Sequence, residues 1–153
     1  MPDLSASATR VQAALHAAGV EARVVELPQS TRTAAEAAQA CGCDVAQIVK
    51  SLVFLRDGEP VLVLCSGANT VDAQRLGLAK ADADVVRRAT GFAIGGVPPY
   101  GFPAPLETLV DEDLLGYDEI WAAAGTPRSV FPLTPAQLVE RTGGTVAAVS
   151  PAS

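Results

Sequence analysis

Histidine, cysteine and aromatic residues are all scarce in this chain of 153 residues, which has one histidine, three cysteines and 5% aromatic residues. A structural zinc site usually takes four cysteine, histidine or carboxylate ligands, so the composition argues against a zinc site. We expect no metal and no cofactor. Three thiols cannot all pair with one another, and disulfide scaffolds are typical of small secreted domains. The sequence therefore argues against a disulfide-stapled fold.

Positive charge and long apolar runs are also in short supply. The net charge is −6, whereas a general nucleic-acid-binding surface is usually basic, so any contact with RNA should be local. The candidate cations, each equally explained as a solvated surface charge, are Arg75, Lys80, Arg87, Arg88 and Arg128. No apolar run reaches the roughly 18 residues of a membrane span, and the first residues lack the features of a signal peptide. We expect a cytoplasmic protein without membrane contact.

A mixed order of helices and strands follows from the periodicity. Helices are predicted over residues 4–18, 33–40, 72–78, 82–90 and 134–143, and strands over 20–27, 47–55, 60–65, 107–111, 118–124, 129–131 and 145–149. This order predicts an α+β fold, a mixed β-sheet surrounded by helices, in a single domain over residues 1–153. Two nearly continuous apolar strands, 47–55 and 60–65, are joined by an Asp57-Gly58 turn, so we place this hairpin at the centre of the sheet.

One lysine, Lys50, lies in the middle of the apolar strand 47–55. Burial of an unpaired ammonium is costly, so Lys50 needs a partner. Three explanations are open: an internal carboxylate such as Asp111 or Asp113, a side chain that reaches the surface, or an anionic ligand rich in oxygen. The acidic residues at 111–113 are themselves typical of a helix start, with Asp113 as its N-cap.

Residues 91–105 read Gly-Phe-Ala-Ile-Gly-Gly-Val-Pro-Pro-Tyr-Gly-Phe-Pro-Ala-Pro, which is too rich in glycine and proline for a regular element. The segment is apolar, unlike a flexible linker. It therefore favours either the wall of a shaped pocket or a tight crossing of the chain. A second glycine turn is predicted at 125–127.

Four segments in this order resemble the YbaK/EbsC family of aminoacyl-tRNA deacylases, which is related to the editing domain of prolyl-tRNA synthetase. They are Gln47-Ile48-Val49-Lys50-Ser51-Leu52-Val53-Phe54, Gly95-Gly96-Val97-Pro98-Pro99-Tyr100-Gly101, Asp111-Glu112-Asp113-Leu114-Leu115 and Ala123-Ala124-Gly125-Thr126-Pro127. The resemblance extends over residues 10–149. It implies a mixed-sheet fold and hydrolysis of the ester that links a wrong amino acid to a tRNA. The implied partner is the acceptor end of an aminoacyl-tRNA, with an aminoacyl-tRNA synthetase as a further candidate.

The resemblance also implies the residues of the site. The catalytic set would be Lys50, Gly95 and Gly96, and the substrate-binding set would be Val97, Pro98, Pro99, Gly101, Asp111, Gly125, Thr126 and Pro127. The apolar residues 97–99 would limit the size of the amino-acid side chain. Phe102 stands where many relatives carry a histidine, so the identity of the amino acid stays open.

The residue types constrain the chemistry further. The chain has no G-x-S-x-G elbow, and its one histidine lies far from any candidate serine, so we expect no covalent intermediate on the protein. A positioned water or a group of the substrate would act instead. Lys50 would hold a phosphate or the ester oxygen, and backbone N–H groups of Gly95 and Gly96 would serve the oxyanion. Ser51 should point to the opposite face of the strand, so it is a weaker candidate than Lys50 for the same pocket.

The leading hypothesis is a trans-editing deacylase for a small amino acid such as cysteine or alanine, with tRNA-Pro as a candidate carrier. Serine and non-protein amino acids remain open. The alternative is a non-catalytic module that binds a nucleotide, a tRNA end or a protein partner, which the acidic net charge and the missing histidine favour. A redox role for Cys41 and Cys43 is a third hypothesis.

Overall fold

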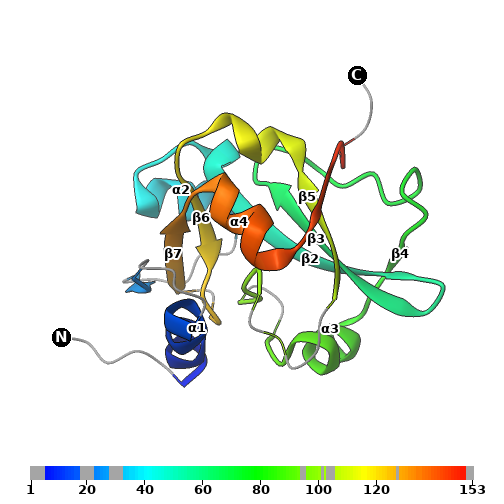
Figure 1. The fold of residues 1–153 in the computed structure, drawn as a ribbon, viewed down its shortest axis with the longest axis horizontal. Coiled ribbons are helices and arrows are strands. Elements are labelled where there is room, and N and C mark those ends of the chain that lie inside the picture. The colour runs from blue at the N-terminus through cyan, green and yellow to red at the C-terminus, as the bar shows by residue number, and fades with distance from the viewer. Residues whose placement is uncertain are drawn as a thin grey trace.

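The computed structural model describes residues 6–17, 23–27, 33–93, 96–100, 102, 106–126 and 128–150, which form an eight-stranded mixed sheet with four α-helices (Figure 1). The helices are α1 (Ala6–Ala17), α2 (Ala34–Cys41), α3 (Ala83–Thr90) and α4 (Pro135–Thr142), with 3₁₀ turns η1 (Val45–Gln47) and η2 (Glu112–Gly116). The strands are β1 (Val25–Glu26), β2 (Ile48–Arg56), β3 (Glu59–Ser66), β4 (Ala79–Lys80), β5 (Glu107–Asp111), β6 (Ile120–Ala123), β7 (Ser129–Leu133) and β8 (Thr145–Ala147). The predicted α+β class is confirmed. None of the helices in these residues has the length and apolar character needed to cross a bilayer.

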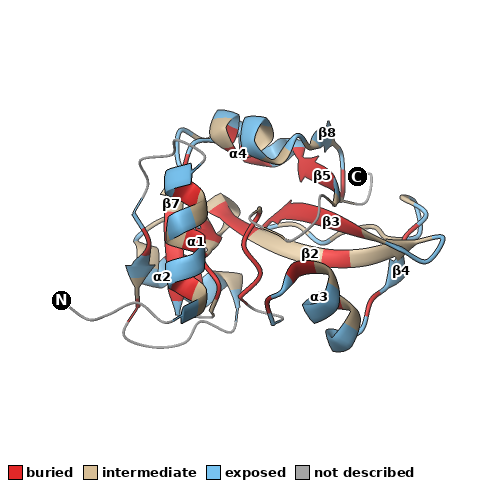
Figure 2. Cartoon of the chain, turned by 60° about the horizontal axis from the view of Figure 1, so that its bottom comes forward, coloured by how far each residue is buried: buried red, intermediate tan, exposed pale blue. Residues whose placement is uncertain are grey.

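The hairpin of β2 and β3 lies at the centre of the sheet, as the sequence predicts. The strand order is β1-β7-β6-β2-β3-β5-β8, and β4 pairs with β2. Asp57 and Gly58 have φ angles of 52° and 81°, the positive values that a tight two-residue hairpin turn requires. β3 has the antiparallel strand β2 on one edge and the parallel strand β5 on the other. Its residues 61–66 are buried, whereas much of β2 is only half-buried (Figure 2).

β2 has a continuous partner on only one of its two edges. On the edge away from β3, the parallel strand β6 pairs with Ile48 and Val49, and the antiparallel strand β4 pairs with Phe54 and Leu55. Between them, residues 50–53 have no strand partner on this side among the described residues. We call this stretch the open edge of β2. It exists because β4 and β6 meet β2 at opposite ends (Figure 1).

The two faces of the central hairpin pack into separate apolar clusters. Val49 and Val53 of β2 belong to the larger cluster, which also takes buried residues from α1, α3 and α4. Cys65 and its neighbours on the other face of β3 form the smaller cluster with Val149. Cys65 is fully buried there, which fits its interpretation as a small core residue.

Local signals place most of the helix ends. Thr33, Asp82 and Thr134 are the N-caps of α2, α3 and α4, and each side chain accepts a hydrogen bond from the backbone N–H three residues later. A glycine in the left-handed conformation ends each of these helices. Such caps satisfy backbone groups that would otherwise lack partners, which explains why the predicted ends agree with the structure.

The helix predicted over residues 72–78 is wrong. Asp72 does begin a turn, since its side chain accepts from the N–H of Arg75 and its carbonyl from the N–H of Leu76. Gly77 then takes a φ of 70°, and Leu78 donates back to the carbonyl of Ala73. The left-handed glycine ends the segment after one turn.

Two other predictions need adjustment. Of the strand predicted over 20–27, the structure describes residues 23–27, and of these Val25 and Glu26 pair with β7 at the edge of the sheet. The N-cap of η2 is Asp111 and not Asp113, because the Asp111 side chain accepts from the N–H of Asp113 at 3.0 Å. The acidic residues therefore do start a helical turn, one that begins two residues earlier than predicted.

Candidate functional site

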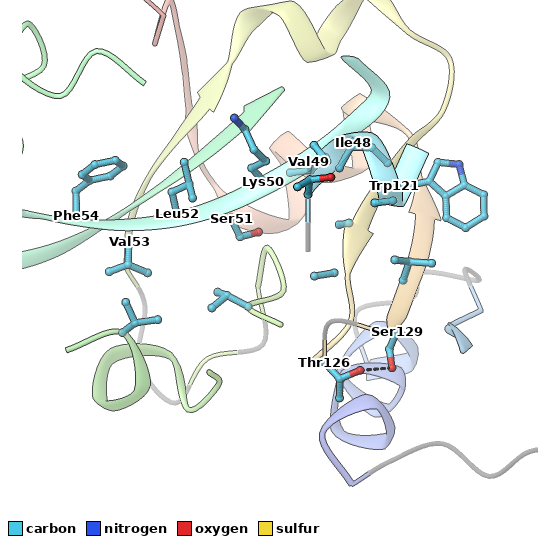
Figure 3. Close-up of a pocket in the computed structure, with 18 of the residues that line it drawn as sticks. Ile48, Val49, Lys50, Ser51, Leu52, Val53, Phe54, Trp121, Thr126 and Ser129 are labelled. Carbon is cyan, nitrogen blue, oxygen red and sulfur yellow. Dashed lines mark hydrogen bonds between the residues drawn. The ribbon is translucent and has the colours of Figure 1, made fainter. Parts of the chain in front are cut away.

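A cavity of about 430 Å³ lies along the open edge of β2 (Figure 3). β2 contributes residues 48–54 to its wall and β6 contributes residues 121–123. The other walls come from α2, α3, β4 and β7, from Val97, and from Thr126 in the turn before β7. Most of this lining is aliphatic, so a ligand held here would be largely removed from water.

Side chains from both faces of β2 reach this cavity. Lys50, Leu52 and Phe54 point to one side of the strand, and Ser51 and Val53 point to the other (Figure 3). This is the alternation that a regular strand imposes. Ser51 does lie on the face opposite Lys50, as predicted, yet this weaker candidate lines the cavity together with Lys50. The cavity passes over the unpaired edge of the strand and so reaches both faces.

Lys50 is half-buried, and its ammonium donates a hydrogen bond to the backbone carbonyl of Asn69. Within the described residues, no carboxylate lies within the 4.0 Å of an ion pair with Lys50. Of the three explanations for this buried lysine, neutralisation by Asp111 or Asp113 is therefore wrong. The hydrogen-bond partner is a neutral carbonyl, so among the described residues the ammonium beside the cavity has no direct carboxylate partner, which suits an anionic ligand.

Asp111 and Asp113 bind the side chain of Asn69 and are not direct partners of the Lys50 ammonium. The side-chain amide of Asn69 donates to Asp111 at 2.9 Å and to Asp113 at 2.7 Å. Asp111 is 1% exposed, and it also accepts from the backbone N–H of Ser66 at 3.0 Å. The two carboxylates thus hold Asn69, whose carbonyl holds Lys50. We call Asn69, Asp111 and Asp113 the Asn69 clamp.

Two glycine-containing segments pack directly on each other at the end of the cavity. The N–H of Gly125 donates to the carbonyl of Gly96 at 2.9 Å. A Cβ on Gly96 would lie 2.7 Å from the Gly125 carbonyl oxygen, and a Cβ on Gly125 would lie 2.7 Å from the carbonyl oxygen of Ser7 in α1. Both distances are shorter than real side chains tolerate. The backbone at Gly96, the turn at Gly125 and helix α1 therefore pack against one another without space for a side chain at either glycine.

The structure brings some of the predicted site residues to the cavity and leaves others away from it. Lys50, Val97 and Thr126 line it. The residues that are buried but do not line the cavity are Gly96, Pro98, Pro99, Asp111 and Gly125. Gly95, Gly101 and Pro127 lie outside the described residues. Phe102, at the position of the missing histidine, packs against the larger apolar cluster.

The N–H of Gly96 is not available as an oxyanion donor in this structure. It donates to the carbonyl of Ala93 at 3.0 Å. A backbone N–H that already has a good acceptor gains little from a second. The role predicted for the Gly96 N–H is therefore not supported by its geometry, whereas the role predicted for Gly95 falls outside the described residues.

Sequence reasoning missed Trp121 and Ser129 as lining residues and named Lys80 only as one of the candidate cations. Lys80 of β4, Trp121 of β6 and Ser129 of β7 all reach the cavity. Ser129 is fully buried, shares a 2.7 Å hydrogen bond with Thr126, and donates to Glu26 of β1. Only Lys80 had a usable signal, since the chain contains just two lysines and both line this cavity.

The chemistry open to the cavity is limited by what lines it. None of its described lining residues is a histidine, a cysteine or a carboxylate. The hydroxyl of Ser51 is buried and has no hydrogen-bond partner, so no base is in place to activate it. Among the described residues no group of three His, Cys, Asp or Glu side chains is placed to hold a metal ion.

The thiols of the C-x-C pair are poorly suited to redox chemistry. Burial, with a smaller contribution from Cys43, raises the pKa of Cys41 to about 11. Burial and the nearby Asp44 raise the pKa of Cys43 as well. Because the thiolate is the reactive form, these shifts disfavour the redox hypothesis.

Comparisons with known proteins point to one family. Residues 28–140 match the family model described as aminoacyl-tRNA editing domain. The chain is 32% identical over 124 residues to YwhH of Bacillus subtilis (strain 168), an uncharacterized protein, with 76% of this chain and 79% of YwhH covered. It is 30% identical over 94 residues to a proline–tRNA ligase of Ligilactobacillus salivarius (strain UCC118), with 57% of this chain and 16% of the ligase covered.

A solved structure extends the likeness to the whole fold. A crystal structure described as a candidate trans-editing enzyme for prolyl tRNA synthetase superposes with a TM-score of 0.93 at 54% sequence identity. That comparison covers 98% of this chain and 100% of the other. Every element that lines the cavity therefore falls within the compared region.

Proposed function

The chain belongs to the aminoacyl-tRNA editing domain family, and from this premise we propose that it is an aminoacyl-tRNA deacylase. The proposed reaction is hydrolysis of the ester between an amino acid and the terminal ribose of a mischarged tRNA. The enzyme would act in trans, on aminoacyl-tRNA made by a separate synthetase. Its proposed partner is the acceptor end of the tRNA, and a synthetase is a further candidate partner.

The position of Lys50 carries this proposal. Its ammonium lies beside an apolar cavity without a carboxylate partner. The register pairs Lys80 with Phe54, whose side chain lies on the same side of β2 as Lys50, so both lysines of the chain face this side. In a chain with a net charge of −6, this local pair of cations supports binding of the phosphate-bearing end of a nucleic acid.

The lining residues support a mechanism in which the protein binds and orients the substrate. Water adds to the ester carbonyl carbon, the bond to the ribose oxygen breaks, and that oxygen takes a proton and leaves as a hydroxyl. Since no described lining side chain is a histidine or a carboxylate, we assign the proton transfers to water and to groups of the substrate. Lys50 stabilises negative charge on the ester or on the adjoining phosphate, and exclusion of water strengthens that interaction.

The proposed substrate carries a small amino acid. Val97, Ala81 and Val86 line the cavity and belong to the same apolar cluster as Val53, and these aliphatic walls suit a small side chain such as alanine or cysteine. Such walls discriminate weakly, because one methylene in an apolar pocket changes binding by about 1–3 kcal/mol. The likeness to a candidate trans-editing enzyme and to prolyl-tRNA ligases supports tRNA-Pro as the first carrier to test.

The experiment is a deacylation panel. Purified protein is incubated with tRNA-Pro charged with alanine, cysteine, serine or proline, and the loss of the ester is followed with time. We expect one or more small mischarged amino acids to be released well above the buffer rate. Lys50→Met, which keeps the length of the side chain without the charge, should lower kcat/KM by about 10²–10³-fold. Arg141→Met at the exposed end of α4, outside the cavity lining and not among the candidate RNA-contacting cations, is the matched control and should retain activity.

A binding module without catalysis is the competing function, which the absence of a protein base in the cavity favours. Tight binding of an aminoacyl-tRNA with no ester loss above buffer would establish that alternative and reject the deacylase. Equal activity of wild type and Lys50→Met would also reject the assigned role of Lys50.

A further inference from the structure

The direction of each backbone group along the open edge of β2 follows from one hydrogen bond. The N–H of Gly67 donates to the carbonyl of Ile48 at 2.7 Å, so the backbone groups of Ile48 face β3. Backbone groups alternate in direction along a strand. Those of Lys50 and Leu52 therefore also face β3, and those of Ser51 and Val53 face the cavity. The N–H of Ser66 confirms the alternation on β3, because it leaves the β2 ladder and donates to Asp111.

Within the part of the chain that the structure describes, three backbone groups on this edge have no partner in the sheet. The ladder with β6 ends at the pair Val49–Ala122, before it would reach the N–H of Ser51. The ladder with β4 begins at the non-hydrogen-bonded pair Phe54–Lys80, which uses the carbonyl of Val53 but not its N–H. The groups that therefore remain without a strand partner are the N–H and carbonyl of Ser51 and the N–H of Val53. They form a donor, an acceptor and a donor in a row.

One side-chain group on this edge is also without a partner. The hydroxyl of Ser51 is shielded from solvent and, among the described residues, has no hydrogen-bond partner. An unsatisfied buried polar group usually costs a folded protein stability, and native structures keep few of them. This hydroxyl and the three backbone groups lie at the edge of a ligand-sized cavity, where a polar guest could bond to them.

The same edge can supply an oxyanion donor in place of the N–H of Gly96. The N–H of Gly96 is committed to Ala93, and Gly95 lies outside the described residues. We infer that the aminoacyl group of the substrate binds along the open edge of β2, its α-ammonium donating to the Ser51 carbonyl and its ester carbonyl oxygen accepting from the N–H of Val53. This inference rests on the proposed deacylase function and names how the same site holds the acyl group.

Charge separation fits this arrangement. The Lys50 side chain leaves β2 on the face opposite Ser51 (Figure 3), so an α-ammonium at the Ser51 carbonyl lies on the edge between them and not against the lysine. The phosphate-bearing part of the substrate takes the Lys50 side, and the amino-acid side chain takes the side of Val53 and Val97. Main-chain groups recognise what all aminoacyl groups share, which leaves selection among amino acids to the apolar wall.

Amide hydrogen exchange measured by NMR tests the inference directly. In the free protein the amides of Ser51 and Val53 should exchange fast, whereas those of Lys50 and Leu52, bonded to β3, should exchange slowly. The probe is 3′-alanylamino-3′-deoxyadenosine, an amide that cannot be hydrolysed as an ester. At nine-tenths occupancy, exchange at Ser51 and Val53 should slow by about tenfold, since exchange proceeds through the empty site.

Adenosine alone is the control ligand and should leave both amides fast. Protection by adenosine would place the base on this edge and overturn the inference. It is equally overturned if both amides are already slow in the free protein, or if the alanyl probe protects neither of them at its highest soluble concentration.

Val53→Pro provides a kinetic test, because proline removes the one N–H without breaking a ladder bond. Compared with Val53→Ala, which keeps the N–H, it should lower kcat about tenfold or more while KM changes little. If wild type deacylates and the two variants have equal kcat, the backbone role fails and the proposed function stands. If wild type does not deacylate any ester, the function fails, and the exchange experiment still decides whether the edge binds an aminoacyl group.

Discussion

Asp111→Asn should destabilise the protein although it changes only one atom of a buried side chain. The Asp111 carboxylate is 1% exposed and accepts three hydrogen bonds, from Ser66, Asn69 and the N–H of Asp113. An amide in its place has one oxygen, so at least one of these donors would face an N–H₂ group. Losing one charge-assisted bond and weakening the others should cost about 2–3 kcal/mol.

Thermal unfolding and urea titration at pH 7 measure this loss. For a chain of this length, about 2–3 kcal/mol corresponds to a decrease in Tm of roughly 5–10 °C. Asp118→Asn, at an exposed position, removes the same charge and should change stability by less than about 0.5 kcal/mol. If the unfolding free energies of the Asp111 and Asp118 variants differ by less than about 0.5 kcal/mol, the Asn69 clamp does not contribute to stability as argued.

The same variant should also loosen Lys50, because Asn69 loses one of the two acceptors that hold it. The chain has two lysines, so Lys80 is an internal reference for acetylation followed by mass spectrometry. The ratio of Lys50 to Lys80 acetylation should rise in Asp111→Asn. An unchanged ratio would show that the clamp does not control the ammonium.

Three further changes have defined outcomes. Gly96→Ala places a methyl group 2.7 Å from the carbonyl oxygen of Gly125 and should lower the free energy of unfolding, measured by urea titration, by about 1–3 kcal/mol. The control Gly116→Ala, with no atom within 4 Å of the new Cβ, should not lower it. Equal stabilities of the two variants would contradict the packing argument. Because the pKa of Cys41 is raised to about 11, its alkylation by iodoacetamide should keep accelerating about tenfold per pH unit from pH 7 to pH 9, and a plateau in that range would exclude a raised pKa. Burial raises the pKa of Tyr100 to about 12, above its unfolded value near 10, so its contribution to stability is complete below pH 10 and is lost as the pH rises towards 12. Tyr100→Phe should remove this part of the alkaline loss in urea titrations between pH 9 and pH 11. Identical slopes of unfolding free energy against pH for the two proteins would refute this expectation.

Elements with local causes were predictable from the sequence. The caps Thr33, Asp82 and Thr134 and the Asp57-Gly58 turn act within a few residues of themselves, so the pattern that predicts them also builds them. The helix predicted over 72–78 failed for a local reason as well, because one left-handed glycine outweighed a cap and a weak apolar repeat. The residues of the site were harder to predict. Lys50 stood out as a charge in an apolar strand, yet its partner, Asn69, has no marking in the sequence.

By itself, the sequence determined the α+β class, the central hairpin and the presence of a lysine that had to find a partner in a nonpolar strand, since each depends on periodicity, turn chemistry or the cost of burying charge. Tertiary structure alone decided where that lysine points and what surrounds it. β4 and β6 come from segments some forty residues apart and meet the same strand at different ends, and no local pattern encodes the unpaired stretch between them. The cavity, the open backbone groups and the role of Asp111 behind Lys50 all follow from that meeting, because contacts between distant segments form only when the whole sheet is assembled.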